Sequence, residues 1–310
     1  MATFSIIILN WNGCSHLQTF LPSVVKSDHP DFEIILADNA STDESVKWVR
    51  THYPDVRVLS FDENYGYCKG NNLAAKSANG DFLIFLNNDV KVDKSWLQPL
   101  KNVFDRFPKT AAVQPKLLSY RQPNYFEYAG AAGGMLDRLG FPYCRGRTFL
   151  GVERDEGQYD DYPEKIFWAS GAALCIRKTL FEEIGGFDER FEFHMEEIDL
   201  CWRLQRLGYE IRVAPDAVVW HLGGGSLHRD DPRKLYYNFR NNLIMLTKNY
   251  DTTPLPLLLF VRSLTDGAIA LSFLLRGLPS HWKNIAKAYR DFFSKLPYWL
   301  EERGRGNSEL

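Results

Sequence analysis

The chain has 310 residues, of which 45% are hydrophobic, 14% aromatic and 25% charged, so it is long and apolar enough to fold around a large core. Its 37 lysines and arginines and 39 aspartates and glutamates give a formal net charge of -2, which excludes the strongly basic surface typical of nucleic-acid-binding proteins. The five cysteines are scattered and form no C-x-x-C pair, which excludes a disulfide framework or a zinc site and favours a reducing cytosol.

Short apolar runs in the first third of the chain predict strands. They lie at 4–9, 32–37, 56–61 and 81–86, and they alternate with stretches of helical spacing. This alternation is typical of a largely parallel sheet that is covered by helices. The first run has neither a basic segment before it nor a small-residue cleavage site after it, so it is predicted to be a strand and not a signal peptide.

Helix signals separate these strands. Ser41 and Glu44 form a capping box with Asp43 between them, which predicts a helix start after the second strand. A second helix is predicted over about 68–79. A third is predicted to begin near Asp93, because apolar residues follow it at helical spacing, namely Trp96, Leu100, Val103 and Phe104.

The middle of the chain is less regular. Residues 119–167 are rich in glycine, proline, tyrosine and aspartate, which predicts loops or short hairpins. Regular structure is expected again at 172–176, followed by a helix over about 196–207 with Gly208 just beyond its end. The segments IRVA and AVVWH, at 211–214 and 217–221, are strand-like.

The C-terminal tail has a different composition. Residues 254–275 are apolar but contain Arg262 and Asp266, and a charge near the middle of a bilayer costs about 2.5–3.5 kcal/mol, so a membrane span is not expected. Residues 281–300 mix lysines and arginines with aromatic residues, which is typical of a helix lying at a membrane surface. Packing on the rest of the chain or on a second subunit is the alternative. The residues concerned are Lys283, Lys287, Arg290, Lys295, Trp282, Tyr289, Phe292, Phe293, Tyr298 and Trp299.

Polar residues follow each of the four predicted N-terminal strands, at 10–13, 38–43, 62–66 and 87–89. In open α/β sheets, ligands bind beyond the carboxyl ends of the strands, so these segments are expected to converge on one rim. Each segment alone is equally consistent with an ordinary turn.

The order of these motifs resembles family two of the inverting glycosyltransferases, particularly rhamnosyltransferase-like members that build bacterial surface polysaccharides, over about residues 3–245. The resemblance implies a GT-A fold, a Rossmann-like α/β/α sandwich with a mostly parallel mixed sheet. It also implies a nucleotide-sugar-binding half at 1–115, an acceptor-binding and catalytic half at 116–250, and a helical tail at 251–310.

The resemblance assigns donor-binding residues to the first half. Asn10 and Asn12 stand in the family's N-W-N-G motif, and Asp38 matches the aspartate that reads the nucleotide base. An N-x-G-x-x-x-G-N-N element is expected to bring backbone and amide groups to ribose or sugar hydroxyls, through Asn64, Gly66, Gly70, Asn71 and Asn72.

A metal site is also implied by the resemblance. The family's D-x-D signature stands here as Asn87-Asn88-Asp89, which keeps only the last carboxylate. A nucleoside diphosphate leaving group calls for Mn²⁺ or Mg²⁺, with Asp89 as one ligand and with Asn87 and Asn88 near the donor. His221 matches the histidine of an H-x-x-G-x-S motif that can complete the metal site, although a single histidine can also be structural.

The second half supplies the acceptor pocket and the base. Trp168, Ser170 and Gly171 match a family segment that lines this pocket. The family's E-D-x-D-L-x-x-R stretch, where a carboxylate acts as base, stands here with Glu196 and Glu197 in its first two positions, so the second acid is a glutamate and the assignment between the two stays open.

Helical spacing favours Glu197 as the base. Glu197 falls on the apolar stripe of its helix, where partial burial would raise its pKa toward the range useful to a base, whereas Glu196 shares its side with Asp199 and Arg203. The latter two are expected to form an ion pair on the helix surface or in support of the site. The stripe comprises Leu200, Cys201, Leu204 and Leu207.

Together these features predict inverting transfer from a nucleotide-diphosphosugar to a glycan or lipid-linked saccharide, by a cytoplasmic enzyme on the inner face of the cell membrane, with a homo-oligomer left open. The alternative is a catalytically reduced nucleotide-sugar-binding or scaffold protein, because only one carboxylate of the D-x-D signature remains. A nucleotidyltransferase is disfavoured by the lack of a P-loop or an N-terminal basic phosphate motif, and a dinucleotide-dependent oxidoreductase by the lack of a G-x-G-x-x-G after the first strand. The base, the sugar, the acceptor and the linkage stay open.

Overall fold

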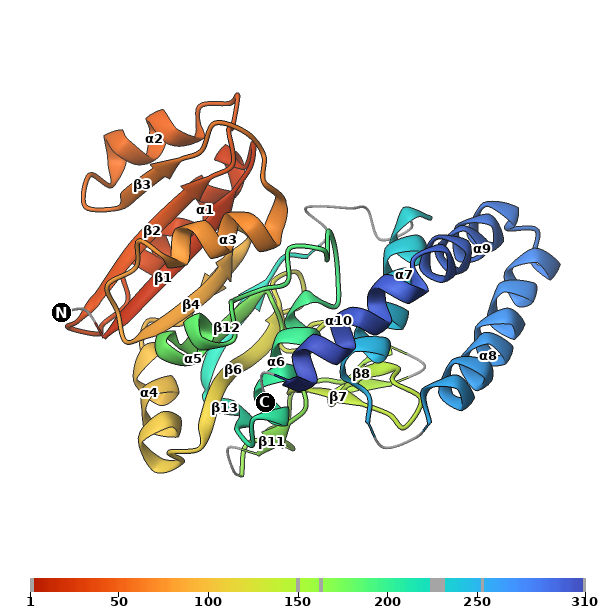
Figure 1. Ribbon diagram of the computed structural model, residues 1–310. Helices are drawn as coiled ribbons and strands as arrows, with labels where there is room; N and C mark the ends of the chain where they lie inside the picture. Colours follow the sequence, from red (N-terminus) through yellow and green to blue (C-terminus); the bar gives the residue numbers. More distant parts are fainter. Residues whose placement is uncertain (1–2, 149–150, 162–163, 224–231, 252–253, 309–310) are drawn as a thin grey trace.

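A computed structural model describes residues 3–148, 151–161, 164–223, 232–251 and 254–308. Within them, a nine-stranded sheet lies between two layers of helices, and three further helices extend to one side of it (Figure 1). The strand order is β11-β13-β6-β12-β4-β1-β2-β3, with β5 paired to β13. The predicted α/β class with a mixed central sheet and a helical tail is confirmed.

The N-terminal half of the sheet is parallel. Its register aligns the carboxyl ends of the strands, because Asn10 pairs with Asp38 and Leu9 with Asn87. Nearly all side chains in β1, β2 and β4 are buried, as expected of apolar strands that are covered on both faces. The predicted strands are confirmed as β1 (Phe4–Asn10), β2 (Phe32–Asp38), β3 (Arg57–Ser60) and β4 (Phe82–Asn87).

The other half of the sheet is mixed. β12 (Ala173–Arg177) runs antiparallel between β4 and β6 (Thr110–Ser119), and the sequence analysis did not predict β6. β13 (Glu210–His221) runs parallel to β6 with a register shift between Ala214 and Val218, so the two strand-like segments form one bulged strand. Because β6 crosses position 115, the boundary proposed there lies within a strand of the continuous sheet.

Short strands occupy the irregular middle of the chain, as predicted. β7 (Gly134–Leu136) pairs with β8 (Pro142–Cys144), and β9 (Arg147–Thr148) pairs with β10 (Gly151–Val152). Two more strands join the edge of the large sheet by pairing with β13, namely β5 (Val90–Val92) and β11 (Lys165–Ile166).

Helices cover both faces of the sheet. One buried cluster joins the first face to α1 (Cys14–Val25), α2 (Ser45–His52) and α4 (Leu97–Arg106). A second cluster joins the opposite face to α3 (Gly66–Ala75), α5 (Lys178–Glu183), α6 (Glu196–Arg206) and α7 (Arg233–Asn249). The predicted end of α6 is confirmed, since Gly208 follows it with a φ of 85°.

The start of α2 differs from the prediction. The helix begins at Ser45, and Asp43 accepts hydrogen bonds from the Ser45 amide and hydroxyl, whereas the Ser41 hydroxyl donates to Asp38. Ser41 is therefore used in the strand-end turn and does not cap the helix. The predicted helices near 68 and 93 begin instead at Gly66 and Leu97.

The tail forms α8 (Leu255–Leu275), α9 (Pro279–Ser294) and α10 (Leu296–Ser308). Arg262 and Asp266 are 1% and 0% exposed and pair with each other at 3.1 Å, on the inner side of α8. Arg262 also donates to the Leu139 carbonyl at 2.8 Å, and the Tyr289 hydroxyl of α9 donates to Asp266 at 2.6 Å. Among the described helices, α8 alone is long and apolar enough to cross a membrane, a test that buried core helices also pass.

The expectation of one surface helix over 281–300 is wrong. α9 ends at Ser294 and α10 follows, and Phe292 and Trp299 are buried between helices. Seven of the twelve exposed large apolar side chains in the described tail belong to α8. Five of them share its outer side, namely Leu257, Phe260, Leu264, Leu271 and Leu275.

Candidate functional site

The ends of β1, β2 and β4 meet through the side chain of Asn10. Its amide nitrogen lies 3.2 Å from both Asp38 Oδ1 and Ser41 Oγ, and its oxygen accepts from Asn88 Nδ2 at 2.8 Å. A Cβ at Gly13 would lie 2.4 Å from both Asn10 Oδ1 and Asn88 Nδ2, so only glycine fits beside them. The structure thus brings three of the predicted strand-end segments together.

Asp38 and Asn12 hold the shape of this rim. Asp38 is buried, and its carboxylate accepts from the Ser41 hydroxyl at 2.6 Å and from the Ser41 amide at 3.0 Å. Asn12 has a φ of 50° and accepts from the Thr42 amide at 2.7 Å. Next to Asn12, Trp11 is 58% exposed, an open aromatic face to which the sequence analysis gave no role.

The second predicted donor element starts α3. Asn64 accepts from the amide of Gly66, whose φ of 72° favours glycine. A Cβ at Gly70 would lie 2.7 Å from Leu9, so this glycine lets α3 approach β1. Asn71 is buried, and its amide nitrogen has no hydrogen-bond partner among the described residues.

Asn72 makes structural contacts, and its expected contact with the donor stays a prediction. Its amide donates to the Phe187 carbonyl at 2.8 Å and accepts from the Phe187 amide at 2.9 Å. It therefore fastens α3 to residues 184–195, a segment between α5 and α6 that we call the strap.

The predicted metal ligands face each other. His221 Nε2 lies 3.1 Å from Asp89 Oδ1, the Gly223 amide donates to Asp89 Oδ2 at 3.2 Å, and Asn87 Nδ2 is 3.4 Å from His221 Nε2. Glu127 Oε1 lies 3.8 Å from the other ring nitrogen of His221, and sequence reasoning missed this residue because it falls in the irregular middle segment. The glycines and serine that follow in the predicted motif, at 224–226, lie outside the described residues.

Neighbouring charges outweigh burial in setting the pKa values of His221 and Asp89. Burial lowers the pKa of His221, but Asp89 and Glu127 raise it to about 10. Burial raises the pKa of Asp89, but His221 outweighs that effect, and the pKa lies below the usual value. The pair is therefore a buried ion pair when no metal is bound.

Asp89 and His221 can supply two of the ligands of a metal site. Neighbouring ligands around an ion with bonds of about 2.1 Å lie about 3 Å apart, which matches the 3.1 Å between Asp89 Oδ1 and His221 Nε2. No group of three His, Cys, Asp or Glu side chains suited to a metal occurs in the part of the chain that the structure describes. Asp89 and His221 thus fit as two ligands of such a site.

The two glutamates follow a strained turn. His194 and Met195, the last residues of the strap, have φ values of 64° and 75°, and Glu196 begins α6 directly after them. Such left-handed residues are held only by surrounding contacts. Asn241 of α7 supplies one, since its amide donates to the carbonyls of Phe193 and His194 at 2.6 and 3.0 Å.

Glu196 and Glu197 differ in their exposure to solvent. Glu196 is 8% exposed, whereas Glu197 is half-buried, and one carboxylate oxygen of each has no partner among the described residues. Burial raises the pKa of Glu197 to about 7 and that of Glu196 well above its usual value. A Cβ at Gly171 would lie 3.9 Å from the Glu197 Cβ, so Glu197 stands beside the predicted acceptor segment.

The ion pair of Asp199 and Arg203 lies on the other side of α6. Asp199 is 0% exposed, so its 2.8 Å ion pair with Arg203 lies in the interior and not on the surface. Asp199 also accepts from Lys248 at 2.9 Å and from Asn249 at 2.8 Å. Packing of α7 covers this side of α6, so of the two expected places for the ion pair, the helix surface is excluded.

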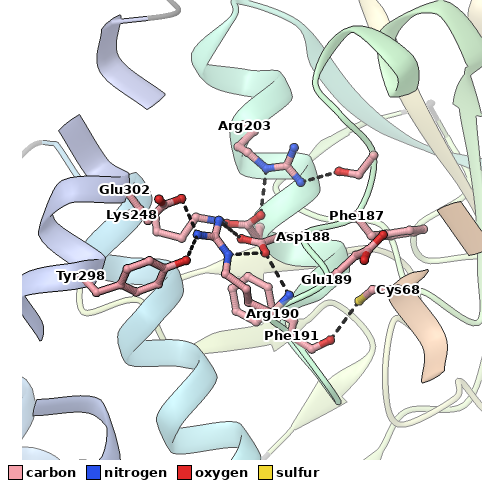
Figure 2. Close-up of polar contacts among 12 residues, drawn as sticks. Cys68, Phe187, Asp188, Glu189, Arg190, Phe191, Arg203, Lys248, Tyr298 and Glu302 are labelled. Carbon is pink, nitrogen blue, oxygen red and sulfur yellow. Dashed lines mark hydrogen bonds and ion pairs between the residues drawn. The ribbon is translucent and has the colours of Figure 1, made fainter. Parts of the chain in front are cut away.

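A network of charges connects this helix to the tail (Figure 2). Lys248 donates to Asp188 as well as Asp199, and Arg190 pairs with Asp188 and with Glu302 of α10. Arg203 donates to the carbonyls of Ile184 and Gly186, both at 2.8 Å. We call this set the strap network, three cations and three carboxylates: Arg190, Arg203, Lys248, Asp188, Asp199 and Glu302.

Two of the three residues of the predicted acceptor segment are buried. Trp168 is 5% exposed and its indole nitrogen donates to the Met135 carbonyl, and its expected place in the acceptor pocket stays a prediction. Ser170 is also buried, and its hydroxyl donates to the Ala129 carbonyl at 3.1 Å. Gly171 is half-buried, and its carbonyl accepts from the Tyr67 hydroxyl at 2.9 Å.

The family model described as "Glycosyl transferase family 2" matches residues 5–182, which hold the strand-end rim and Asp89. The chain belongs to this family. It is 28% identical over 263 residues to N-acetylglucosaminyl-diphospho-decaprenol L-rhamnosyltransferase of Mycobacterium tuberculosis, covering 79% of this chain and 84% of the relative. It is 32% identical over 218 residues to the O-antigen biosynthesis protein RfbC of Myxococcus xanthus, covering 69% of this chain but 17% of that protein. The predicted nucleotide-sugar glycosyltransferase is thereby confirmed.

Solved glycosyltransferase structures share the fold. TarS of S. aureus, residues 1–349 in complex with UDP-GlcNAc, aligns with a TM-score of 0.62 at 16% identity, covering 100% of this glycosyltransferase and 88% of that chain. The mannosyltransferase PcManGT of Pyrobaculum calidifontis, in complex with GDP-Man and Mn2+, aligns with a TM-score of 0.57 at 17% identity, covering 99% and 85%. The predicted GT-A fold is confirmed by these likenesses.

Proposed function

We propose that the chain is an inverting glycosyltransferase of surface-polysaccharide synthesis in which Glu197 is the catalytic base. The observation that carries this assignment is a half-buried carboxylate beside Gly171, with an oxygen that lacks a partner among the described residues and a pKa raised by burial to about 7. Such a group accepts a proton near neutral pH. The better buried Glu196 serves to position its neighbour.

The reaction is a single in-line displacement. The acceptor hydroxyl oxygen attacks the anomeric carbon of the donor sugar, and its proton passes to Glu197. The bond between that carbon and the diphosphate oxygen breaks, and its electron pair leaves with the nucleoside diphosphate. Holding the two substrates in line supplies much of the rate enhancement.

The strand-end rim is the proposed donor site. Trp11 offers an exposed ring on which a nucleotide base can stack, and the amide nitrogen of Asn71, which has no partner among the described residues, can donate to a hydroxyl. Asp89 and His221 would hold Mn²⁺ or Mg²⁺, which neutralises the charge of the leaving diphosphate when it is bound. Asn87 lies 3.4 Å from His221 and can orient it, and Asn88, which donates to Asn10, lies on the proposed donor side.

The proposed acceptor is a lipid-linked saccharide at the inner face of the cell membrane. The name of the mycobacterial relative specifies a saccharide on a diphospho-decaprenol, which supports this class. The outer side of α8 carries exposed apolar residues, whereas Arg262 and Asp266 turn inward. We therefore assign membrane contact to that side, in place of the aromatic residues of α9 and α10.

The proposal is tested by measuring transfer and donor hydrolysis across UDP, GDP and dTDP sugars, each with Mn²⁺, Mg²⁺ or a chelator. We expect one donor to be used with cation present and product of inverted anomeric configuration. Turnover that is unaffected by the chelator would remove the metal assignment, and a retained configuration would remove the displacement mechanism.

A second candidate function is that of a catalytically reduced nucleotide-sugar-binding or scaffold protein. It is favoured by the Asn87-Asn88-Asp89 signature and by the ion pair in which His221 already occupies the one remaining carboxylate. Donor binding in calorimetry with no hydrolysis and no transfer for any donor and acceptor would support this function over the enzyme.

A further inference from the structure

A cavity of about 720 Å³ lies between the strap and the helices α7, α9 and α10. Its lining includes Tyr236 and Arg240 from α7, Lys295 after the end of α9, and Trp299 from α10, with Glu192 of the strap on the opposite side. In Figure 1 these three helices lie beside the sheet, on the side from which α8 extends. Neither the predicted donor residues nor the base line this cavity.

Positive charge gathers around the cavity. Lys287 lies over the Tyr236 ring at 4.8 Å, and Arg290 pairs with Asp291. Arg240 and Lys295 line the cavity with the carboxylates Glu192 and Asp291, and Lys287 and Arg290 stand next to lining residues. The surplus of two positive charges around the cavity therefore comes from these two neighbouring cations and not from the lining itself. Arg190 also lines the cavity, but its charge is balanced within the strap network.

One of the lining cations, Lys295, is free to meet a ligand, whereas a second, Arg240, already holds an ion pair with Glu192. Lys295 is exposed, and its ammonium has no ion-pair or hydrogen-bond partner in the described part of the chain. Arg240 donates to the neutral groups of Asn241 and Tyr236 at 2.9 and 3.3 Å, and its carboxylate neighbour, Glu192, is 3.7 Å away and exposed. The walls also hold the apolar surfaces of Ile244 and Trp299.

The cavity is close to the proposed base. Glu192 lies five positions before Glu197, and five residues of fully extended chain span at most about 18 Å. The strap itself is fixed to α7 by the bonds of Asn241 to the Phe193 and His194 carbonyls. The strap thus joins a lining residue of the cavity directly to the catalytic pair.

We propose that this cavity binds the diphosphate of a polyprenyl diphosphate-linked acceptor, with its first isoprene units against the apolar wall. The proposal rests on the proposed function, because the diphosphate is the group that joins the proposed acceptor saccharide to its lipid. A diphosphate diester carries two negative charges, which match the surplus around the cavity. Lys295 and Arg240 are the residues assigned to contact it.

Steady-state transfer tests the assignment with two soluble acceptors, a saccharide on a short prenyl diphosphate and the same saccharide as an alkyl glycoside. We expect Lys295→Ala to raise KM for the diphosphate acceptor about tenfold, and Lys295→Glu to raise it further, because a charge-assisted contact to phosphate is lost or reversed. KM for the nucleotide sugar should stay constant. Lys109→Glu, an exposed lysine before β6, is the matched control.

Equal effects on both acceptors would overturn the proposal. A rise confined to KM for the nucleotide sugar would also overturn it, because the cavity would then hold the diphosphate of the donor.

Binding of farnesyl diphosphate to the full chain separates this proposal from the proposed function. We expect calorimetry to show binding that Lys295→Glu weakens at least about tenfold, with no binding of farnesol. If that pattern holds while no transfer is found with any donor, the proposed function fails and the cavity assignment stands. If Lys295→Glu and the unmodified chain bind alike, the cavity assignment fails whatever the activity.

Discussion

Lys248 reaches from the end of α7 into the buried side of α6 and donates to Asp199 at 2.9 Å. The contact joins the helix that carries the proposed base to the helix on which the tail packs. We expect Lys248→Met to destabilise the protein by about 3 kcal/mol, since removing one partner leaves buried carboxylates without their cation. Chemical denaturation measures the change.

The control for this prediction is Lys101→Met. Lys101 pairs with Asp105 on the surface of α4, so the same substitution there should cost less than about 1 kcal/mol. Equal losses at the two sites would show that the strap network adds no stability.

Transfer should depend on pH through Glu197. Burial raises the pKa of this carboxyl to about 7, so it holds a proton below that pH and cannot accept another from the acceptor. We expect kcat/KM to fall about tenfold per pH unit below 7 and to level off above it. A rate that is flat from about pH 5 to 8 would contradict the assignment of the base.

Substituting each glutamate in turn should show which of the two is the catalytic base. We expect Glu197→Gln to lower kcat by about 10² to 10⁴-fold with donor affinity unchanged, because the amide keeps the shape and loses the proton acceptor. Glu196→Gln should do less damage. The reverse order would transfer the role of base to Glu196.

Asp89→Ala should abolish metal-dependent turnover without unfolding the chain. The residue lies in the turn between β4 and β5, and its removal takes away a proposed ligand and the partner of His221. Metal titration by calorimetry and circular dichroism measure the two effects. Unchanged cation affinity in the variant would exclude Asp89 from the metal site.

The outer side of α8 should determine membrane binding. We expect the full chain to co-sediment with anionic vesicles, and Phe260→Asp with Leu264→Asp to weaken that binding more than about tenfold, because both side chains are exposed on the apolar face. Thermal melting should be unchanged. Tyr125→Asp, an exposed aromatic outside the tail, is the control.

Loss of self-association instead of vesicle binding in the α8 variant would assign that face to a second copy of the chain. Truncation near Tyr250 is a poorer test than these substitutions, because Arg303 of α10 donates to the Thr247 carbonyl and Glu302 belongs to the strap network. Removing the tail should therefore also lower stability.

Short-range sequence patterns predicted the N-terminal strands and the polar segments that follow them. The apolar runs became β1 to β4, and the strand-end segments around Asn10 and Asp38 met as expected because parallel strands end at one edge. β6 was not predicted, although nearly all of its side chains are buried. Its burial comes from β12 and β13, which are far away in the sequence.

What stayed open at the site has the same origin. Spacing left the Asp199–Arg203 pair either on the helix surface or in support of the site, and only the packing of α7 on that side of α6 decides between them. The bond of the Trp168 indole to the Met135 carbonyl likewise depends on a residue 33 positions away. Glu127 and Lys248 carry no local signal, because their roles exist only through contacts with His221 and Asp199.

The strap network has a consequence for how this sequence can vary. Its three cations and three carboxylates are contributed by the strap, α6, α7 and α10, so a single charge change leaves the network with one unbalanced charge. The cost is greatest at its buried members, Asp188, Asp199 and Lys248. A related chain that replaces Lys248 with an apolar residue must also give up Asp188 or Asp199 to remain stable. Substitutions at these positions should therefore occur in matched pairs during evolution, so the tail and the strap should change together.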